Sequence, residues 1–115
     1  IFTPLAWLMS VPMSEASFFG SLLGQKLILT EFVAYASLGE AIQNPEGSPI
    51  SQRTSKMAVY ALCGFANFAS IAIQIGGLTA LAPDRRQTIV TLSFKAMIGG
   101  ALASWMTACV AGLLL

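Results

Sequence analysis

Long apolar stretches alternate with short polar ones along the chain, and this pattern predicts an all-α integral membrane protein. Each long stretch exceeds the roughly 20 residues that a membrane-crossing helix needs. The polar stretches between them are too short to form a separate domain. The pattern divides the chain into six parts, namely residues 1–16, 17–43, 44–56, 57–82, 83–87 and 88–115.

The first part, residues 1–16, mixes apolar side chains with Pro4 and Pro12. Proline interrupts a helix interior, so two prolines at this spacing prevent one regular helix. The segment is also too short to span a bilayer, and Trp7 is typical of the membrane–water boundary. It is predicted to be an interfacial helix or a connector.

Two parts are predicted to lie outside the apolar layer. Residues 44–56, NPEGSPISQRTSK, contain turn-forming pairs such as Asn-Pro and Ser-Pro and are predicted to form a loop. Residues 83–87, PDRRQ, are predicted to form a short polar turn. This turn separates residues 57–82, an uncharged run that can span the membrane with tilt, from the last span, residues 88–115.

The last span carries small residues at a spacing of four, which favours close packing of helices. These residues are Gly99 with Ala103, and Gly100 with Ser104.

Residues 17–43 are largely apolar but contain Lys26, Glu31 and Glu40. A carboxylate in the middle of a straight span costs about 3 kcal/mol on insertion scales. Two half-membrane helices that meet at a polar tip near Glu31 would avoid this cost, because the tip would face protein and water. The length also fits one span, so the pattern leaves a re-entrant hairpin and a single span open.

Three polar side chains interrupt the uncharged span: Asn67, Ser70 and Gln74. On one continuous helix, spacings of three and four place them on one face. Such a stripe either hydrogen-bonds to a neighbouring helix or binds a ligand, and the spacing alone leaves both open. Glycines flank the stripe on both sides and would permit local unwinding, which favours a ligand site.

Glu31 needs a polar partner within the same apolar interior. One candidate is Lys26, although a spacing of five does not place two side chains on the same face of one helix. A hairpin would still allow this pair to form. The other candidate is the polar stripe, because a carboxylate, an amide and a hydroxyl together suit a polyol such as a sugar.

Composition narrows the class of protein. The 115 residues are 56% hydrophobic and 10% charged, with a net charge of +1. Soluble domains carry about 25% charged residues, so this is membrane composition, and the small net charge argues against a nucleic-acid partner. There is no His, and Cys63 lies far from Cys109, which excludes a Cys/His zinc site. Without His, and with Glu31 as the one well-placed carboxylate, an enzyme is not expected.

The chain contains the motifs LTEFVAYASL at residues 29–38 and YALCGFANFASIAIQIGGLTALAPDRR at residues 60–86. Both motifs resemble the C-terminal part of concentrative nucleoside transporters. The resemblance extends over essentially the whole chain. It implies the second of two inverted repeats, in which residues 17–43 form a re-entrant hairpin. Residues 57–82 would then be a discontinuous membrane helix, broken near residues 66–70, and residues 88–115 the last membrane helix.

The same resemblance implies a substrate site. Glu31, Asn67 and Ser70 are expected to bind the ribose hydroxyls of a nucleoside, and Phe65 is expected to lie near the base. Thr30 stands where many members of the family have asparagine, so the resemblance assigns no role to this position.

For the whole protein, the resemblance implies a nucleoside symporter of the cell membrane (inner or plasma), coupled to Na⁺ or H⁺. A homotrimer is expected, and an N-terminal remainder is expected to hold the base-reading residues and the sodium site. No cofactor or metal is expected in this piece. The start at Ile1 also suggests a piece of a longer protein. The alternative is a structural membrane-helix subunit whose polar residues only pack helices.

Overall fold

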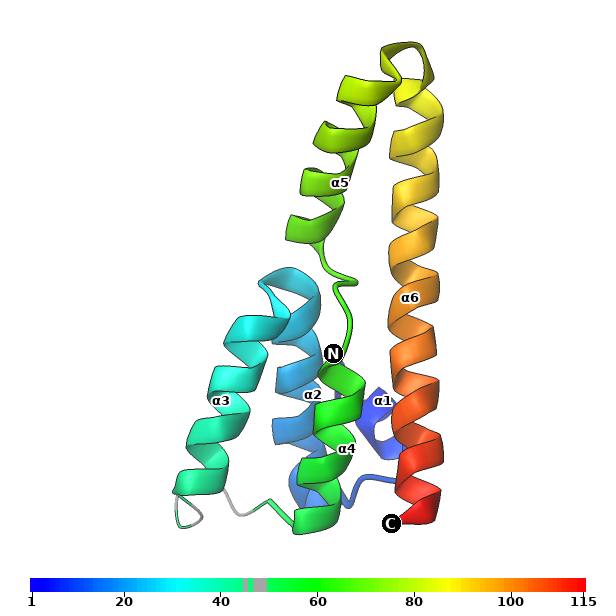
Figure 1. Ribbon diagram of the computed structural model, residues 1–115. Helices are drawn as coiled ribbons and strands as arrows, with labels where there is room; N and C mark the ends of the chain where they lie inside the picture. Colours follow the sequence, from blue (N-terminus) through cyan, green and yellow to red (C-terminus); the bar gives the residue numbers. More distant parts are fainter. Residues whose placement is uncertain (45, 47–49) are drawn as a thin grey trace.

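A computed structural model describes residues 1–44, 46 and 50–115, and these residues form helices and turns without a β-strand. The predicted all-α class is therefore confirmed. Figure 1 shows a lower bundle that contains α1 to α4, with α5 above it and α6 running along the whole length. The elements are α1 (Thr3–Leu8), α2 (Met13–Ile28), α3 (Glu31–Gln43), α4 (Gln52–Leu62), α5 (Phe68–Leu81), the 3-10 helix η1 (Pro83–Arg85) and α6 (Arg86–Leu114).

Helices α2 and α3 pack against each other around a turn at Leu29 and Thr30. Thr30 is extended, with φ −152° and ψ 160°, and its hydroxyl accepts a hydrogen bond from the Val33 N–H at 3.4 Å. This N-cap starts α3 in a new direction. The two helices have 16 and 13 residues, so each is shorter than the roughly 20 residues of a membrane crossing.

Helix α2 starts earlier than the sequence indicates. Residues 13–16, which were expected in the connector, form its first turn. Pro12 explains this start, because proline is tolerated beside the first turn of a helix and not inside it. The connector is thus reduced to the short helix α1. It packs tightly on α2, since a Cβ on Gly20 would lie 2.8 Å from the Thr3 nitrogen.

The predicted span at residues 57–82 consists of two helices, α4 and α5, with non-helical residues 63–67 between them. Helix α4 starts at Gln52, because the Ser51 hydroxyl accepts the Thr54 N–H at 3.2 Å and caps it. Glu15 holds Ser51 in place by accepting its N–H at 2.8 Å. The predicted loop is therefore helical from residue 52 onward. Its turn residues 45 and 47–49 lie outside the described residues.

Helix α6 starts at Arg86, two residues earlier than predicted, and packs against α4 and α5. Near its end, Gly112 lets α4 approach, since a Cβ there would lie 2.8 Å from Met57 Sδ. The Arg53 guanidinium donates hydrogen bonds of 3.2 and 3.0 Å to the Gly112 carbonyl and ties α4 to this end. The core lies in the lower bundle and includes Ala6, Phe19, Leu22, Leu23, Ala34, Leu38, Met57, Leu62 and Ala108.

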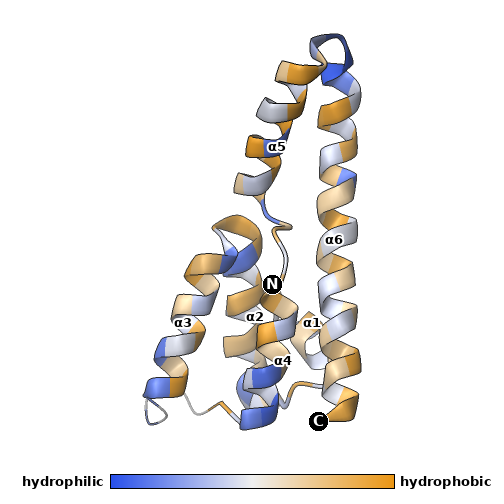
Figure 2. Ribbon diagram, in the orientation of Figure 1, coloured by the Kyte–Doolittle hydropathy of each residue, from blue (hydrophilic) through white to orange (hydrophobic). Residues whose placement is uncertain are grey.

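Helices α5 and α6 contain many apolar residues, which Figure 2 shows as orange segments along both helices. Large apolar side chains such as Ile73, Leu81 and Met106 are exposed. The segment Pro83–Leu114 is long and apolar enough to cross a membrane, and only 22% of its apolar window is buried inside the chain. A core helix of a soluble protein would be mostly buried, so this exposure favours a lipid or protein environment.

Candidate functional site

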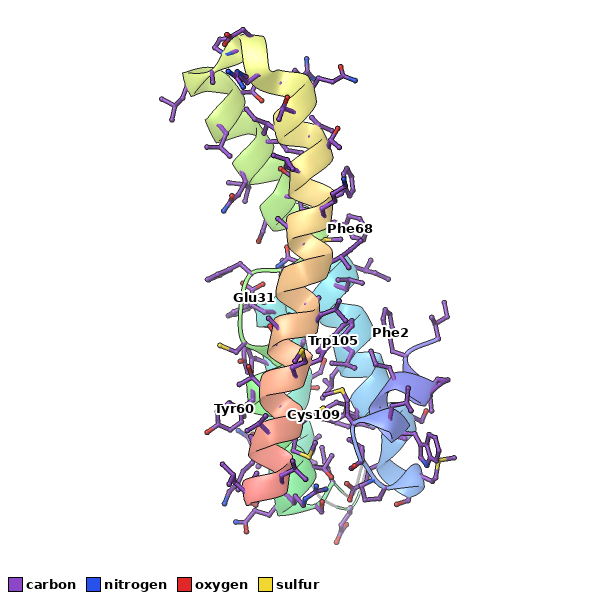
Figure 3. All side chains as sticks on the ribbon, turned by 90° about the vertical axis from the view of Figure 1, so that its right-hand side faces the viewer. Phe2, Glu31, Tyr60, Phe68, Trp105 and Cys109 are labelled. Carbon is purple, nitrogen blue, oxygen red and sulfur yellow. The ribbon has the colours of Figure 1, made fainter. Side chains whose placement is uncertain are left out.

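The turn between α2 and α3 lies beside the break between α4 and α5. Glu31 is the first residue of α3, and Asn67 is the N-cap of α5. The Asn67 Nδ2 donates a hydrogen bond to the Glu31 Oε2 at 2.6 Å, although the two residues are 36 positions apart. Figure 3 shows Glu31 near the mid-height of the molecule, beside the extended stretch that leads to α5. The structure thus brings together polar groups from two separate apolar segments.

Both residues lie at helix N-termini. The first backbone N–H groups of a helix lack partners within the helix, and the helix dipole is positive at this end. Two such ends converge here, which favours the Glu31 carboxylate and the oxygen atoms of a polar ligand. Half-helices that begin at a common point inside an apolar region are a general design of transporter binding sites.

Asn67 differs from its predicted setting. It is 1% exposed, and its Oδ1 accepts the Ser70 N–H at 2.8 Å. With φ −148° and ψ 167°, it lies outside α5. The interpretation of one continuous helical face is therefore wrong for Asn67. Ser70 is still its neighbour because of the cap, whereas Gln74 lies farther along α5 and is exposed.

The break covers residues 63–67, three residues earlier than the expected 66–70, because α5 already begins at Phe68. Gly64 makes the exit from α4 possible. Its φ is +96°, in the region that side chains disfavour and glycine adopts readily. The Phe65 carbonyl then accepts the Asn67 N–H at 3.0 Å and closes a tight turn.

Phe65 is 75% exposed, and it shares a cavity with Ser70 between α5 and α6. The cavity has a volume of about 500 Å³, and Gln74 and Ser93 also line it. Glu31 and Asn67 lie outside this lining. Hydrogen bonds therefore join three of the four expected site residues, namely Glu31, Asn67 and Ser70. Phe65 is connected to them only through the cavity that it shares with Ser70.

Lys26 is a residue whose role the sequence did not predict. Its Nζ donates hydrogen bonds to the carbonyl of Ala61 at 2.9 Å and to that of Cys63 at 3.1 Å. The side chain is 1% exposed. These carbonyls belong to the last turn of α4 and to the residue after it, where unpaired carbonyl oxygens favour a cation. The alternative Lys26–Glu31 pair is not formed, because Lys26 binds these carbonyls and Glu31 binds Asn67.

Helix α6 contacts the break from another side. The Ser104 hydroxyl lies 2.9 Å from the Cys63 carbonyl and 3.0 Å from the Gly100 carbonyl of its own helix. A Cβ on Gly100 would lie 3.4 Å from the Ala66 Cβ. The predicted small pair of Gly100 and Ser104 therefore packs on the break. In contrast, apart from its own helix backbone, no atom of the described residues lies within 4 Å of a Cβ built on Gly99.

The site offers hydrogen bonds to a ligand with hydroxyl groups. Glu31 is half-buried, and within the described ranges its Oε1 accepts no hydrogen bond. This oxygen and the Ser70 hydroxyl are suited to a polyol. In the described part of the chain, no group of three His, Cys, Asp or Glu side chains could hold a metal ion.

Comparison with known proteins gives a consistent result. A family described as "Na⁺ dependent nucleoside transporter C-terminus" matches residues 1–112. The uncharacterized transporter YutK of Bacillus subtilis (strain 168) is 47% identical over 98% of this chain and 27% of its own length. Solute carrier family 28 member 3 of Homo sapiens is 42% identical over 99% of this chain and 18% of its own length.

Among solved structures, CNTnw in an inward-facing substrate-bound state is similar, with a TM-score of 0.91 and 45% sequence identity. The similarity covers 97% of this chain and 27% of that one. The chain thus spans about a quarter or less of the length of these relatives.

Proposed function

The chain belongs to the concentrative nucleoside transporter family, as part of its C-terminal region, and we propose that it supplies the ribose-binding half of the substrate site in a cation-coupled nucleoside symporter. The family consists of transporters and not of enzymes. The observation that carries the proposal is the 2.6 Å hydrogen bond between Asn67 and Glu31. It places a carboxylate at two converging helix N-termini, beside a break in an apolar segment.

The ribose hydroxyls fit this set of groups. The 2′ and 3′ hydroxyls are neighbouring donors, and a carboxylate accepts more than one donor. Glu31 accepts them through its Oε1, while Asn67 holds its Oε2. Ser70 contributes a hydroxyl at the start of α5. A hydrogen bond to a charged group contributes about 1.5 to 3 kcal/mol, so Glu31 is the strongest contact. The exposed ring of Phe65 packs near the base.

We place the elements in the membrane as one repeat of an inverted pair. Helices α2 and α3 form a re-entrant hairpin, because each is too short to cross. Helices α4 and α5 form one discontinuous membrane helix, and α6 is the last crossing. The break and the hairpin tip then lie at the depth where transporter sites are found.

The remaining parts of the proposal concern the whole protein. The family description supports Na⁺ as the coupling ion, with H⁺ as the alternative. The N-terminal remainder would supply the ion site and the base-reading residues. The intact protein would be a homotrimer in the cell membrane, and this piece would need no cofactor or metal of its own.

One observation favours a second candidate, a structural membrane subunit. Asn67 is 1% exposed, and both ends of its side chain already have partners within the chain. Side chains that only join helices have this appearance. Glu31 opposes this reading, because its Oε1 has no partner within the described residues and the carboxylate is only half-buried.

Uptake by cells that lack nucleoside transporters and express the full-length gene tests the proposal. We expect labelled uridine to accumulate, and we expect accumulation to fall when choline replaces Na⁺. A protein that reaches the membrane without raising uridine uptake, with either Na⁺ or a proton gradient present, would favour the structural subunit.

A further inference from the structure

The last turn of α2 and the first residue of α3 hold the two ends of the break. On one side, the Lys26 ammonium binds the Ala61 and Cys63 carbonyls at the end of α4. On the other side, Glu31 binds Asn67 at the start of α5. A positive group thus meets the carbonyl end of one half-helix, and a negative group meets the N–H end of the next, as helix dipoles favour.

The carbonyls beside Lys26 form a site for a cation. A helix end exposes carbonyl oxygens without partners, and the oxygens of Ala61 and Cys63 both lie within hydrogen-bond distance of one buried nitrogen. The Ser104 hydroxyl contacts the Cys63 carbonyl as well. Burial of a charge is costly unless the charge is paired or hydrogen-bonded. The Lys26 side chain therefore positions its ammonium group where the Ala61 and Cys63 carbonyls bind it.

We propose that Lys26 is a positioning residue for the nucleoside site, acting as a built-in cation that fixes the end of α4. The carbonyls of Ala61 and Cys63 are its binding site, and this site will accept a small alkylammonium ion when the lysine side chain is absent. Lys26 does not touch the nucleoside. It acts through the four residues between Cys63 and the start of α5, which determine where Asn67 meets Glu31. This inference rests on the proposed function for its effect on nucleoside binding.

The experiment uses the purified full-length transporter with Lys26→Met, Lys26→Ala and the control Lys95→Met. Methionine keeps an unbranched apolar stem and removes the charge. Alanine leaves space for propylammonium, which has the same three carbons and nitrogen that the substitution removes. Lys95 is exposed on α6 and donates no hydrogen bond among the described residues, so its substitution removes a charge of the same kind that does not bind the carbonyls of the break. Uridine affinity and thermal unfolding are measured with and without propylammonium.

We expect both Lys26 variants to bind uridine at least about tenfold more weakly, while Lys95→Met stays close to wild type. Propylammonium should restore most of this loss in Lys26→Ala and none of it in Lys26→Met, and 1-propanol should restore neither. Without any nucleoside, propylammonium should also raise the melting temperature of Lys26→Ala alone. This last measurement is independent of the substrate, so it tests the cation site even if uridine does not bind the wild type.

Three results would overturn the inference. The first is uridine binding by Lys26→Met within twofold of wild type. The second is the absence of any effect of propylammonium on folded Lys26→Ala. The third is failure of both Lys26 variants to fold while Lys95→Met folds, because Lys26 would then serve folding alone.

Discussion

Substitution of Asn67 can separate its capping of α5 from its proposed role in nucleoside binding. The Asn67 Oδ1 caps α5 through the Ser70 N–H, and its Nδ2 donates to Glu31. Serine is about as good an N-cap as asparagine, but it has no amide group to donate to Glu31. Asn67→Ser therefore keeps the cap and removes the second contact, whereas Asn67→Ala removes both.

The expected magnitudes follow from these two contacts. Loss of an N-cap costs about 1 kcal/mol of the free energy of unfolding. Loss of the hydrogen bond to the Glu31 carboxylate costs about 1.5 to 3 kcal/mol. Without nucleoside, Asn67→Ser should thus be less stable than wild type, and Asn67→Ala should be less stable again by about 1 kcal/mol.

Added nucleoside tests the proposed role in binding. If the proposed site binds uridine, a concentration of a hundred times Kd should stabilise the wild type by about 2.7 kcal/mol. If either substitution weakens binding a hundredfold, the same concentration gives only about 0.4 kcal/mol. Both Asn67 variants should show this small value, although their stabilities without nucleoside differ.

Thermal unfolding of the purified full-length transporter measures both quantities. Ser51→Ala is a matched control, because Ser51 caps α4 at the end of that helix remote from the break. It should lose stability without nucleoside and retain the full stabilisation by uridine. If Asn67→Ser also retained the full stabilisation, Asn67 would be a cap and a packing residue only, without a part in nucleoside binding.

Three further predictions concern binding, the break and topology. Glu31→Gln should lower uridine uptake at least about tenfold, because it loses charge-assisted hydrogen bonds, and normal uptake by well-inserted protein would contradict this. Gly64→Ala should destabilise the protein by about 1 to 2 kcal/mol at its left-handed φ. Gly99→Ala should be neutral or stabilising, because the new Cβ has open space around it. Equal melting temperatures of the two variants would contradict backbone strain in Gly64→Ala. The basic turn at residues 83–87 should be cytoplasmic. Cysteine at Gln87, in a background without other cysteines, should resist an impermeant thiol reagent added outside, and labelling would reverse the topology.

The sequence predicted the helical class and the approximate segments, because the apolar runs are long and short polar segments clearly separate them. It was less accurate about where helices begin. Residues 52–56 are polar, so their composition predicts a loop. They are helical because Ser51 caps α4 and because Glu15, 36 positions away, holds Ser51. A cap that depends on a long-range contact is not visible in local composition.

Prediction from local sequence pattern has the same limit for the polar stripe at the site. Spacing correctly grouped Asn67 with Ser70, but the reason was different from the expected one. The pair forms because Asn67 caps α5 from outside the helix, not because both residues share a helical face. Periodicity assumes one continuous helix, and the positive φ of Gly64 ends that helix before the stripe begins.

Lys26 could not be assigned from sequence, because its partners are backbone carbonyls. The spacing of five from Glu31 indicated only that the two side chains do not share a helical face. Its actual partners lie 35 and 37 positions away. Every residue has a backbone carbonyl, so the residue types of Ala61 and Cys63 do not mark them as partners of Lys26. A lysine in an apolar segment predicts that a partner exists, without indicating which one.

A comparison of uridine with uracil tests whether this segment binds the sugar of a nucleoside. Calorimetric titration of the purified full-length transporter in Na⁺ measures both affinities under the same conditions. We expect uridine to bind at least about a hundredfold more tightly, because uracil lacks the hydroxyls and leaves the polar groups of the site unpaired. Uracil that bound as tightly as uridine would contradict the assignment of Glu31, Asn67 and Ser70 to the ribose.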